Sequence, residues 1–360
     1  MTLFDLMKLA VDQGASDLHV GVGRPPVLRV HGDLQELPGM PRLTAEDTER
    51  LMRQVIPERH LKELEEHGSA DFGYALENLS RFRVSVFTQK GARGIVMRLI
   101  PTKLLSFEQI GLPEKVKTLL TRPRGLILVT GPTGSGKTTT LATMIDWINE
   151  TQPVHIVTIE DPIEYFHGHK KAQVTQRGIG EDVPTFAEAM RRVLRMDPDV
   201  ILLGEMRDLE TTSAAITAAE TGHLVFGTLH TTGAARTMDR IIDQYPTNQQ
   251  EQIRAQLAVS VVAVISQVLL PRADGRGRIA AFEVMMMNSA IENHIRKGET
   301  FKIPSVMQTQ RRLGMQLLDD HLFDLANEGV ITRDTALAYS QLPGDLRQRF
   351  SGGTPAPQPS

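Results

Sequence analysis

One short stretch restricts the possible fold of this chain more than any other. Residues 131–138 read Gly-Pro-Thr-Gly-Ser-Gly-Lys-Thr and lie between the apolar run 126–129 and the helix-favouring segment 139–150. Glycines let successive backbone N–H groups curl around phosphates, and the following helix points its positive N-terminus at the same anion. The pattern therefore predicts a strand, a phosphate-binding loop and a helix, which form one unit of a parallel α/β sheet.

The loop also supplies candidate ligands for a nucleoside triphosphate and its metal. Lys137 is expected to reach the terminal phosphates as a point charge, and the hydroxyl of Thr138 to contact Mg²⁺. The expected nucleotide-binding positions are Gly131, Pro132, Thr133, Gly134, Ser135, Gly136, Lys137, Thr138 and Thr139. The alternative, a flexible glycine turn, would need neither the strand before it nor the helix after it.

Composition excludes several classes of protein. The 40 lysines and arginines nearly balance the 43 aspartates and glutamates, so no global field favours nucleic acid or an anionic membrane. The chain has no cysteine, which excludes a disulfide framework, a cysteine-ligated zinc site and thiol catalysis, and suits a reducing cytosol. Residues 1–20 lack the apolar block of a signal peptide. The apolar stretch 257–270 is too short to span a bilayer and is interpreted as a buried helix.

The first hundred residues carry the pattern of a small α+β domain built on an antiparallel sheet. Apolar residues at helical spacing predict a helix over residues 3–13, and Thr44 is a good N-cap for a second helix that Pro57 ends. Strand signals occur at residues 17–20, 27–30, 70–76, 81–87 and 94–100. Residues 101–113 show little apolar periodicity and are expected to link this domain to the next.

Arginines gather on one face of this predicted sheet. Residues 81–85 alternate polar and apolar side chains, so Arg81 and Arg83 share a face, and Arg98 lies on a neighbouring strand. Two interpretations are open. The arginines form a solvated face, or their guanidinium groups point across a domain cleft at a nucleotide phosphate.

From residue 114 onwards strands and helices alternate, which is typical of a parallel sheet covered on both faces. Apolar strands are expected at residues 126–129, 155–159, 200–203 and 224–229. Each delivers polar groups at its carboxyl end, where open α/β sheets bind ligands. The expected later elements are helices over about 249–270 and 289–339 and a disordered tail over 346–360.

Three carboxylates at the strand ends are candidates for phosphoryl-transfer chemistry. Glu205 follows its strand as a metal-binding carboxylate would, although it is a glutamate after a glycine rather than an aspartate on the strand itself. Glu160 is the first choice to polarise an attacking water, and Glu164, one helical turn further on, is the alternative. Each acid could instead cap a helix or pair with an arginine.

Two histidines flank the strand at 224–229 and are also candidate site residues. His223 precedes the strand and is assigned to nucleotide binding. His230 follows it at the same sheet edge as the phosphate loop, where it could sense the terminal phosphate or a neighbouring acid. A lone histidine is otherwise a packed core or surface residue.

On a predicted helix, Arg191, Arg192 and Arg195 are either a charged face or contacts to another subunit.

Four segments together carry a family resemblance. GPTGSGKT, TIEDPIE, DPDVILLGEMRD and GHLVFGTLH resemble the Walker A motif, Asp box, Walker B motif and His box of the bacterial type II and type IV secretion ATPase superfamily. GASDLHV, RFRVSVF and PSVMQTQRRLGMQLLDDHL resemble, within it, the twitching-motility ATPases that depolymerise type IV pili. The resemblance extends over residues 1–340 or so.

The resemblance implies an α/β fold: a RecA-like P-loop ATPase core with C-terminal helices over residues 114–345, and a PAS-like N-terminal domain over residues 1–100. It implies a homohexamer that hydrolyses ATP with Mg²⁺, with Arg83 and Arg98 reaching the nucleotide. The implied task is type IV pilus retraction, in the cytoplasm and peripheral to the membrane, beside an inner-membrane platform protein. No covalent anchor, transmembrane segment or nucleic-acid partner is expected.

One motif departs from the family pattern. A C-terminal motif associated with retraction reads AIRNLIRE in the family and AIENHIRK at residues 290–297, so Glu292, His294 and Lys297 differ.

The alternatives to a retraction motor are a pilus extension or secretion ATPase, an accessory pilus subunit with poor hydrolysis, and a DNA-translocating RecA-like motor. Extension motors usually carry a four-cysteine metal element, which this chain lacks, and the near-neutral charge disfavours DNA.

Overall fold

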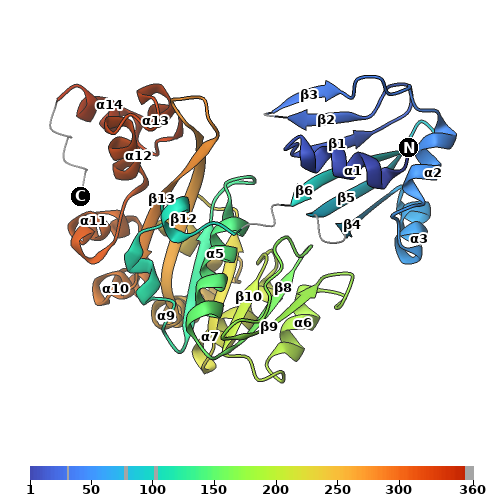
Figure 1. Cartoon of the computed structure of the whole chain (residues 1–360). Coiled ribbons are helices and arrows are strands. Elements are labelled where there is room, and N and C mark those ends of the chain that lie inside the picture. Colours follow the sequence, from blue (N-terminus) through green and yellow to red (C-terminus); the bar gives the residue numbers. More distant parts are fainter. Residues whose placement is uncertain (31, 77–79, 101–103, 353–360) are drawn as a thin grey trace. The chain divides into compact units, whose positions relative to one another are not determined.

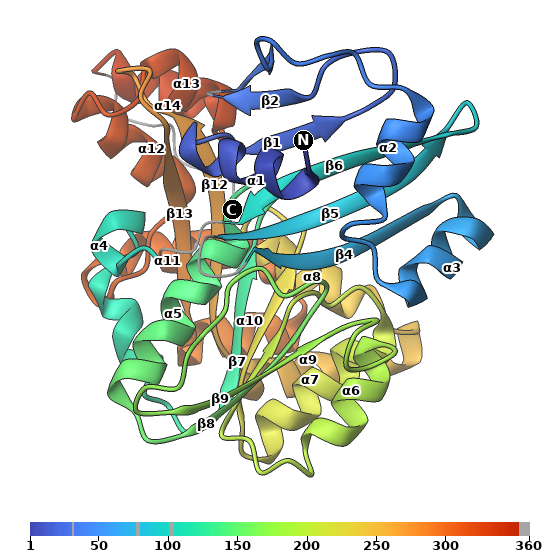
Figure 2. The same ribbon diagram turned by 45° about the vertical axis from the view of Figure 1, so that its right-hand side comes forward.

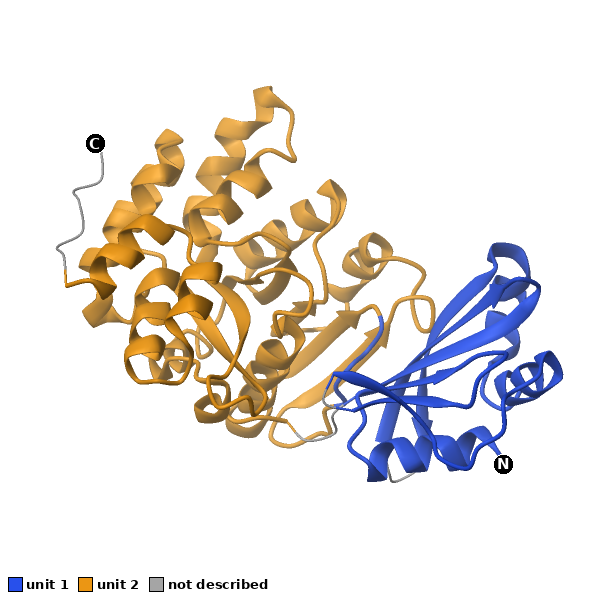
Figure 3. Ribbon diagram, turned by 90° about the horizontal axis from the view of Figure 1, so that it is seen from above, with its two compact units in different colours: residues 1–103, 162–166 blue, residues 104–161, 167–360 orange. Residues whose placement is uncertain are grey.

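The protein divides into two compact units (Figure 3). The computed structural model describes residues 1–30, 32–76, 80–100 and 104–352. Unit 1 comprises Met1–Lys103 and Pro162–Phe166, and unit 2 comprises Leu104–Asp161 and His167–Ser360. Within the described ranges, no helix is both long enough and apolar enough to cross a bilayer.

Unit 1 is built on a six-stranded antiparallel sheet with the order β3-β2-β1-β6-β5-β4 (Figure 1). Its strands are β1 Asp17–Val20, β2 Val27–Val30, β3 Asp33–Glu36, β4 Ser69–Leu76, β5 Ser80–Gln89 and β6 Ala92–Ile100. Its helices are α1 Leu3–Asp12, α2 Ala45–Met52 and α3 Glu58–His67. The predicted antiparallel sheet is confirmed. Sequence reasoning misses α3, and it misses β3 because all four residues of this strand are exposed and show no alternation.

The three helices lie on one face of this sheet (Figure 2). Leu51 of α2 and Leu64 of α3 pack with Phe82 of β5 in one buried cluster, to which α1 also contributes. Side chains alternate along β5, so Arg83 lies on the opposite face, directly beside Arg98 of β6 in the strand register. This division into an apolar and an arginine-bearing face is the one that the sequence predicts.

Unit 2 contains a seven-stranded sheet with the order β13-β12-β7-β11-β10-β8-β9. Neighbouring strands are parallel except β12 and β13, which are antiparallel. The strands are β7 Gly125–Thr130, β8 His155–Glu160, β9 Gln173–Gly178, β10 Val200–Leu203, β11 Leu224–Leu229, β12 Val261–Pro271 and β13 Arg278–Met286. The predicted parallel α/β arrangement is confirmed.

Helices cover both faces of this sheet (Figure 1). Ile127 and Val129 of β7 belong to one core with Met144 of α5, whereas Leu126 and Leu128 belong to a second core on the other face. α5 Lys137–Thr151 contributes to the first core, whereas α6 Phe186–Val193, α7 Leu209–Thr221, α8 Ala234–Ile242 and α9 Gln250–Ser260 contribute to the second, together with later helices at 289–297 and 303–309. Because β7 is buried on both faces, it appears in the sequence as a continuous apolar run.

The interpretation of residues 257–270 as a buried helix is wrong beyond Ser260. α9 ends there, and the chain continues as β12, which lies beside β7. A strand with two buried faces shows no alternation, so periodicity does not separate it from a buried helix. The β-branched residues among positions 261–265 favour the strand. β9 and β13 are also missing from the expected elements.

The expected connection over residues 101–113 is shorter than predicted. Residues 104–113 belong to unit 2, and α4 (Phe107–Ile110) forms within them. Ser106 and Gln109 cap this helix reciprocally, and the ring of Phe107 meets Trp147 of α5 edge-on at a centroid distance of 6.5 Å. The three residues at 101–103 lie outside the described ranges.

The C-terminal helices extend into the expected disordered tail. The helices after the sheet are α10 Ser289–Lys297, α11 Ile303–Thr309, α12 Leu318–Asn327, α13 Arg333–Tyr339 and α14 Pro343–Phe350. Residues 346–350 are therefore helical, because Leu346 is buried and the ring of Phe350 stacks on Phe323 at a centroid distance of 5.1 Å. The part of the expected tail at 353–360 lies outside the described residues.

Candidate nucleotide-binding site

A sharply turned loop of residues 131–136 connects β7 to α5. Gly131, Gly134 and Gly136 have φ angles of 145°, 77° and 90°, a region that residues with side chains rarely enter. A Cβ at Gly131 would also lie 2.2 Å from the carbonyl oxygen of Gln267 and 2.7 Å from Ser135 Oγ. Glycine is therefore required there by conformation and by space, and the tight loop can direct its N–H groups at one anion.

Gln267, on β12, supports this loop through a side-chain hydrogen bond. Its Nε2 atom donates a hydrogen bond of 2.6 Å to the carbonyl oxygen of Ser135, and both residues are buried. Sequence reasoning misses Gln267 because it assigns this stretch to a helix. The available signal is a glutamine inside an otherwise apolar run, since a buried amide needs a polar partner.

The loop carries polar groups that fit the phosphates of a nucleotide. Ser135 Oγ is buried and has no hydrogen-bond partner among the described residues. Lys137 Nζ donates to the carbonyl oxygens of Gly131 and Pro132 at 2.8 Å and 3.1 Å, which holds its charge at the loop. The N-terminus of the 15-residue helix α5 adds its positive dipole end. An anion at this loop would therefore meet an ammonium, a hydroxyl and backbone donors.

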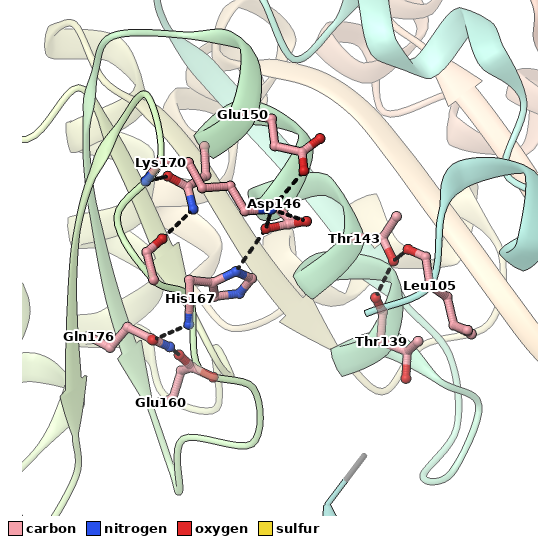
Figure 4. Close-up of polar contacts among 11 residues, drawn as sticks. Leu105, Thr139, Thr143, Asp146, Glu150, Glu160, His167, Lys170 and Gln176 are labelled. Atoms are coloured by element: carbon pink, nitrogen blue, oxygen red, sulfur yellow. Dashed lines mark hydrogen bonds and ion pairs between the residues drawn. The ribbon is translucent and has the colours of Figure 1, made fainter. Parts of the chain in front are cut away.

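The remaining predicted loop positions are accessible or line the start of α5. Pro132, Thr133 and Gly134 are exposed, and Thr138 is half-buried in the first helical turn. The carbonyl oxygen of Thr139 accepts a hydrogen bond of 2.9 Å from Thr143 Oγ1 (Figure 4). All nine predicted loop positions thus lie together, six in the loop between β7 and α5 and three in the first turn of α5.

The candidate residues at the strand ends form a row along one edge of the sheet. β7, β11, β10 and β8 are neighbours in that order, and all are parallel. Their carboxyl ends therefore carry, in sequence along the edge, the phosphate loop, His230, Glu205 and Glu160. In open α/β sheets this edge is where ligands bind. The predicted juxtaposition of these residues follows from the strand order.

Glu205 is held by Arg207 and His230. Its Oε2 accepts from an Arg207 guanidinium nitrogen at 2.7 Å, and its Oε1 lies 3.0 Å from His230 Nε2. Burial raises the pKa of the Glu205 carboxyl. Arg207 and His230 each lower this pKa through a hydrogen bond and through charge, and together they outweigh burial, so the pKa lies below its ordinary value. Glu205 in turn raises the pKa of Arg207. The carboxylate is therefore ionised at neutral pH, which a metal ligand requires.

Glu160 is the most buried of the candidate acids, at 8% exposure. Its Oε1 accepts a hydrogen bond of 2.7 Å from Thr158 Oγ1. The same atom accepts one of 3.2 Å from Gln176 Nε2 (Figure 4). A Cβ at Gly204 would lie 3.2 Å from the Cα of Glu160. The glycine before Glu205 therefore allows the end of β10 to approach Glu160 closely, which explains why the second acid follows a glycine.

Two other candidates are not in this row. His223 precedes β11 and so lies at the amino edge of the sheet, where its Nδ1 is 3.0 Å from the carbonyl oxygen of Ala218. A strand of six residues, roughly 20 Å, separates it from His230. The expected contact of His223 with the nucleotide is thus not supported within one chain. Glu164 lies in Pro162–Phe166, which groups with unit 1.

The predicted arginines have different surroundings. Arg83 is exposed on β5, and its neighbour Arg98 forms an ion pair of 2.9 Å with Asp17 of β1. Both lie in unit 1. Arg191 and Arg192 lie on α6, and Arg195 follows it. The two helical arginines pair with acids of unit 2, which fits a charged face: Arg191 with Glu210, and Arg192 with Glu188.

Gln267→Glu should weaken nucleotide binding about tenfold, because the isosteric carboxylate cannot donate to Ser135 and leaves a buried carbonyl unpaired. Titration with a fluorescent ATP analogue measures the dissociation constant. Gln173→Glu, an equal charge change at an exposed position of β9, is the matched control and should bind as wild type does. Equal affinity in both variants would show that the hydrogen bond from Gln267 to Ser135 is not needed for nucleotide binding.

Glu205 should contribute to stability at neutral pH and lose that contribution in acid. Its folded-state pKa is lowered, so its stabilisation is complete above the unfolded value near 4.5 and disappears as the pH falls through the folded value. Urea unfolding of wild type and Glu205→Gln at about pH 7 and about pH 3.5 measures the difference. A stability difference that is constant or larger in acid would contradict the assigned ion pairs.

Comparison with known proteins places this geometry in a family. The model of the type II/IV secretion system protein family matches residues 4–332. The type IV pilus retraction ATPase PilT of Pseudomonas aeruginosa is 46% identical over 343 residues, which cover 95% of this chain and 99% of that protein. A twitching motility protein of Neisseria gonorrhoeae is 47% identical over 316 residues, covering 88% of this chain and 84% of that protein.

A solved structure shares the fold over nearly the whole chain. The crystal structure of the pilus retraction motor PilT with bound ADP superposes with a TM-score of 0.91 at 47% identity, covering 97% of this chain and 99% of that one. Its RecA-like core with flanking N-terminal and C-terminal parts is thus the fold of this protein. On these matches and on the row of motif residues, the chain belongs to the type II/IV secretion system protein family.

Proposed function

We propose that this chain is an ATPase motor that assembles as a homohexamer and powers type IV pilus retraction, and with it twitching motility. The observation that carries the proposal is the row of phosphate loop, His230, Glu205 and Glu160 at one sheet edge. This row supplies the phosphate cradle and the acids that ATP hydrolysis needs. Near full-length similarity to a pilus retraction ATPase supports the task that the hydrolysis drives.

Each residue of the row has a proposed role. Backbone N–H groups of residues 133–136 and the Lys137 ammonium would bind the terminal phosphates of ATP. Glu160 would accept the proton of the attacking water, with Glu164 as the alternative base. His230 would orient Glu205 and respond to the terminal phosphate. This division assigns the more buried acid, Glu160, to proton transfer and the cation-paired acid, Glu205, to the metal.

Thr138 and Glu205 would hold Mg²⁺, which when bound neutralises phosphate charge and polarises the transferred group. Among the described residues, no group of three or more His, Asp or Glu side chains could hold a metal ion by itself. Mg²⁺ at nucleotide sites typically takes one or two protein ligands and completes its shell with phosphate oxygens and water. The sparse ligand set therefore fits a metal that binds with ATP.

Unit 1 would contribute Arg83 and Arg98 to the same nucleotide. The strand register sets these two residues side by side, and adjacent like charges repel unless an anion lies near them. Arg98 would exchange its ion pair with Asp17 for a phosphate. Binding, hydrolysis and ADP release would then shift unit 1 against unit 2, because only the triphosphate state offers the full set of contacts.

The altered motif at residues 290–297 is compatible with retraction. In α10 the fully buried positions are Ile291 and Ile295, and both match the family pattern. The three differing residues are half-buried or exposed, and His294 forms a new contact of 3.1 Å with Glu299. The helix therefore keeps its two fully buried apolar residues, although a histidine replaces the leucine at position 294. We place the motor in the cytoplasm, peripheral to the inner membrane, where it would act on a platform protein of the pilus machine.

Lys137→Ala should abolish ATP turnover, because the terminal phosphates lose their cation. Glu160→Ala should retain nucleotide binding and lose turnover by about 10²- to 10⁴-fold, the usual contribution of a general base. Steady-state phosphate release and a parallel binding titration measure both effects. Lys8→Ala, at an exposed position of unit 1, is the control. Wild-type turnover in Lys137→Ala would overturn the ATPase proposal.

Loss of the gene should leave cells with excess surface pili and without twitching motility, because pili would still extend but not retract. Electron microscopy of pilus number and a surface-motility assay measure the two traits. The wild-type gene should restore motility, and a gene carrying Lys137→Ala should not. Cells without pili would instead indicate an extension motor, and normal pili with normal motility would rule out both roles.

A further inference from the structure

Gln176 of β9 makes two side-chain contacts that the proposed chemistry has not used. Its Oε1 accepts a hydrogen bond of 2.8 Å from the backbone N–H of His167, and its Nε2 donates to Glu160 Oε1 at 3.2 Å (Figure 4). A backbone N–H can only donate, so the oxygen end of the amide must face His167. The orientation of the amide is therefore determined, and a donor faces the Glu160 carboxylate.

The strand register brings a second donor to the same carboxylate oxygen. Thr158 and Gln176 are direct partners in the parallel pairing of β8 and β9. Thr158 and Glu160 are two residues apart on β8, so their side chains lie on the same face. Thr158 Oγ1 and Gln176 Nε2 thus both bond to Glu160 Oε1. Two donors on one oxygen restrict rotation of the carboxylate and favour its ionised form.

The far end of the Gln176 amide is anchored to the phosphate-loop helix. The side chain of His167 is 4% exposed, and its Nδ1 lies 3.8 Å from Asp146 of α5. Lys170 continues the loop after His167 and pairs with Asp146 and Glu150 at 2.7 Å each (Figure 4). The segment that orients Gln176 is therefore fixed on α5, which begins at Lys137.

We propose that Gln176 is a positioning residue for Glu160, which it holds at the sheet edge that carries the phosphate loop by linking the carboxylate to a segment anchored on α5. In this role Gln176 acts through the Glu160 carboxylate and not on the substrate. It ties the proposed base to the helix that carries the phosphate-binding lysine, so the water-activating and phosphate-binding groups keep a constant separation. This inference rests on the proposed role of Glu160 in proton transfer.

Gln176→Ala should lower kcat about tenfold or more, because Glu160 loses a hydrogen bond to its charged group. The ATP dissociation constant and KM should stay within about twofold, because this hydrogen bond does not involve the phosphate-binding residues. The acid limb of kcat against pH in this variant should move to higher pH, because the carboxylate loses a donor. Gln173→Ala, on the same strand and exposed, is the matched control and should leave all three quantities unchanged.

Gln176→Glu has the shape of the native side chain and tests the donor directly. Protonated, the new carboxyl can donate to Glu160 as the amide does, whereas ionised it repels the Glu160 carboxylate. Its kcat relative to wild type should therefore fall as the pH rises, the opposite of Gln176→Ala. The titratable and charged groups near the pair, Glu205 and Arg207 after β10 and His167 before β9, are the same in both variants.

The outcomes separate this inference from the assignment of Glu160. Normal turnover in Glu160→Gln would remove the proposed base itself. If Glu160→Gln is inactive but Gln176→Ala matches Gln173→Ala, only the positioning role of Gln176 fails. Parallel losses of kcat and of ATP affinity in Gln176→Ala would also overturn it, as a general structural effect. Should Gln176→Ala not fold, a flat pH dependence of relative kcat in the isosteric Gln176→Glu would overturn it.

Discussion

Parallel pairing of β7, β11, β10 and β8 is the constraint on which the candidate site depends. Each strand runs in the same direction, so each delivers its following residues to the same edge. Segments as distant in sequence as the phosphate loop and His230 thereby become neighbours without any direct local preference for each other. The burial of these strands on both faces, in two separate cores, makes the edge rigid enough to hold a defined geometry.

Charge at this edge is arranged for a substrate that brings its own cation. A polyphosphate beside Glu160 and Glu205 would be repelled if no positive charge lay between them. Lys137 offsets part of this repulsion, and Arg207 already pairs with Glu205. A divalent cation bound with the nucleotide would supply the rest. The site is therefore best matched to a metal–nucleotide complex rather than to a free anion.

The two acids differ in what surrounds them, and this supports different roles. Arg207 and His230 hold Glu205 in its charged form, as suits a permanent ligand. Glu160 receives hydrogen bonds from the neutral groups of Thr158 and Gln176, in a more buried position. Neutral donors orient a carboxylate without offering a competing charge. A proton acceptor must be ionised and correctly oriented before the water reacts, and both donors favour that state.

Much of this site is readable from the sequence because its motifs are local. The loop at 131–138 and the acids after apolar strands have short local patterns. These patterns indicate both the local structure and the position at one edge of the sheet. Gln267 and Gln176 are not readable in this way, since each acts on a residue far along the chain through strands with weak or misleading patterns. β12 looks like a buried helix because both of its faces are apolar, and β9 lacks a long apolar run. Only the pairing of β12 with β7 places Gln267 beside Ser135, and only the pairing of β9 with β8 places Gln176 beside Glu160.

A structure with a non-hydrolysable ATP analogue and Mg²⁺ would test the account most directly. The account predicts the terminal phosphate in the loop of residues 131–136, the metal beside Thr138 and Glu205, and a water between the Glu160 carboxylate and the terminal phosphorus. Phosphates bound away from this loop would contradict it. So would a Glu160 carboxylate turned away from the nucleotide, with another acid such as Glu164 holding the water.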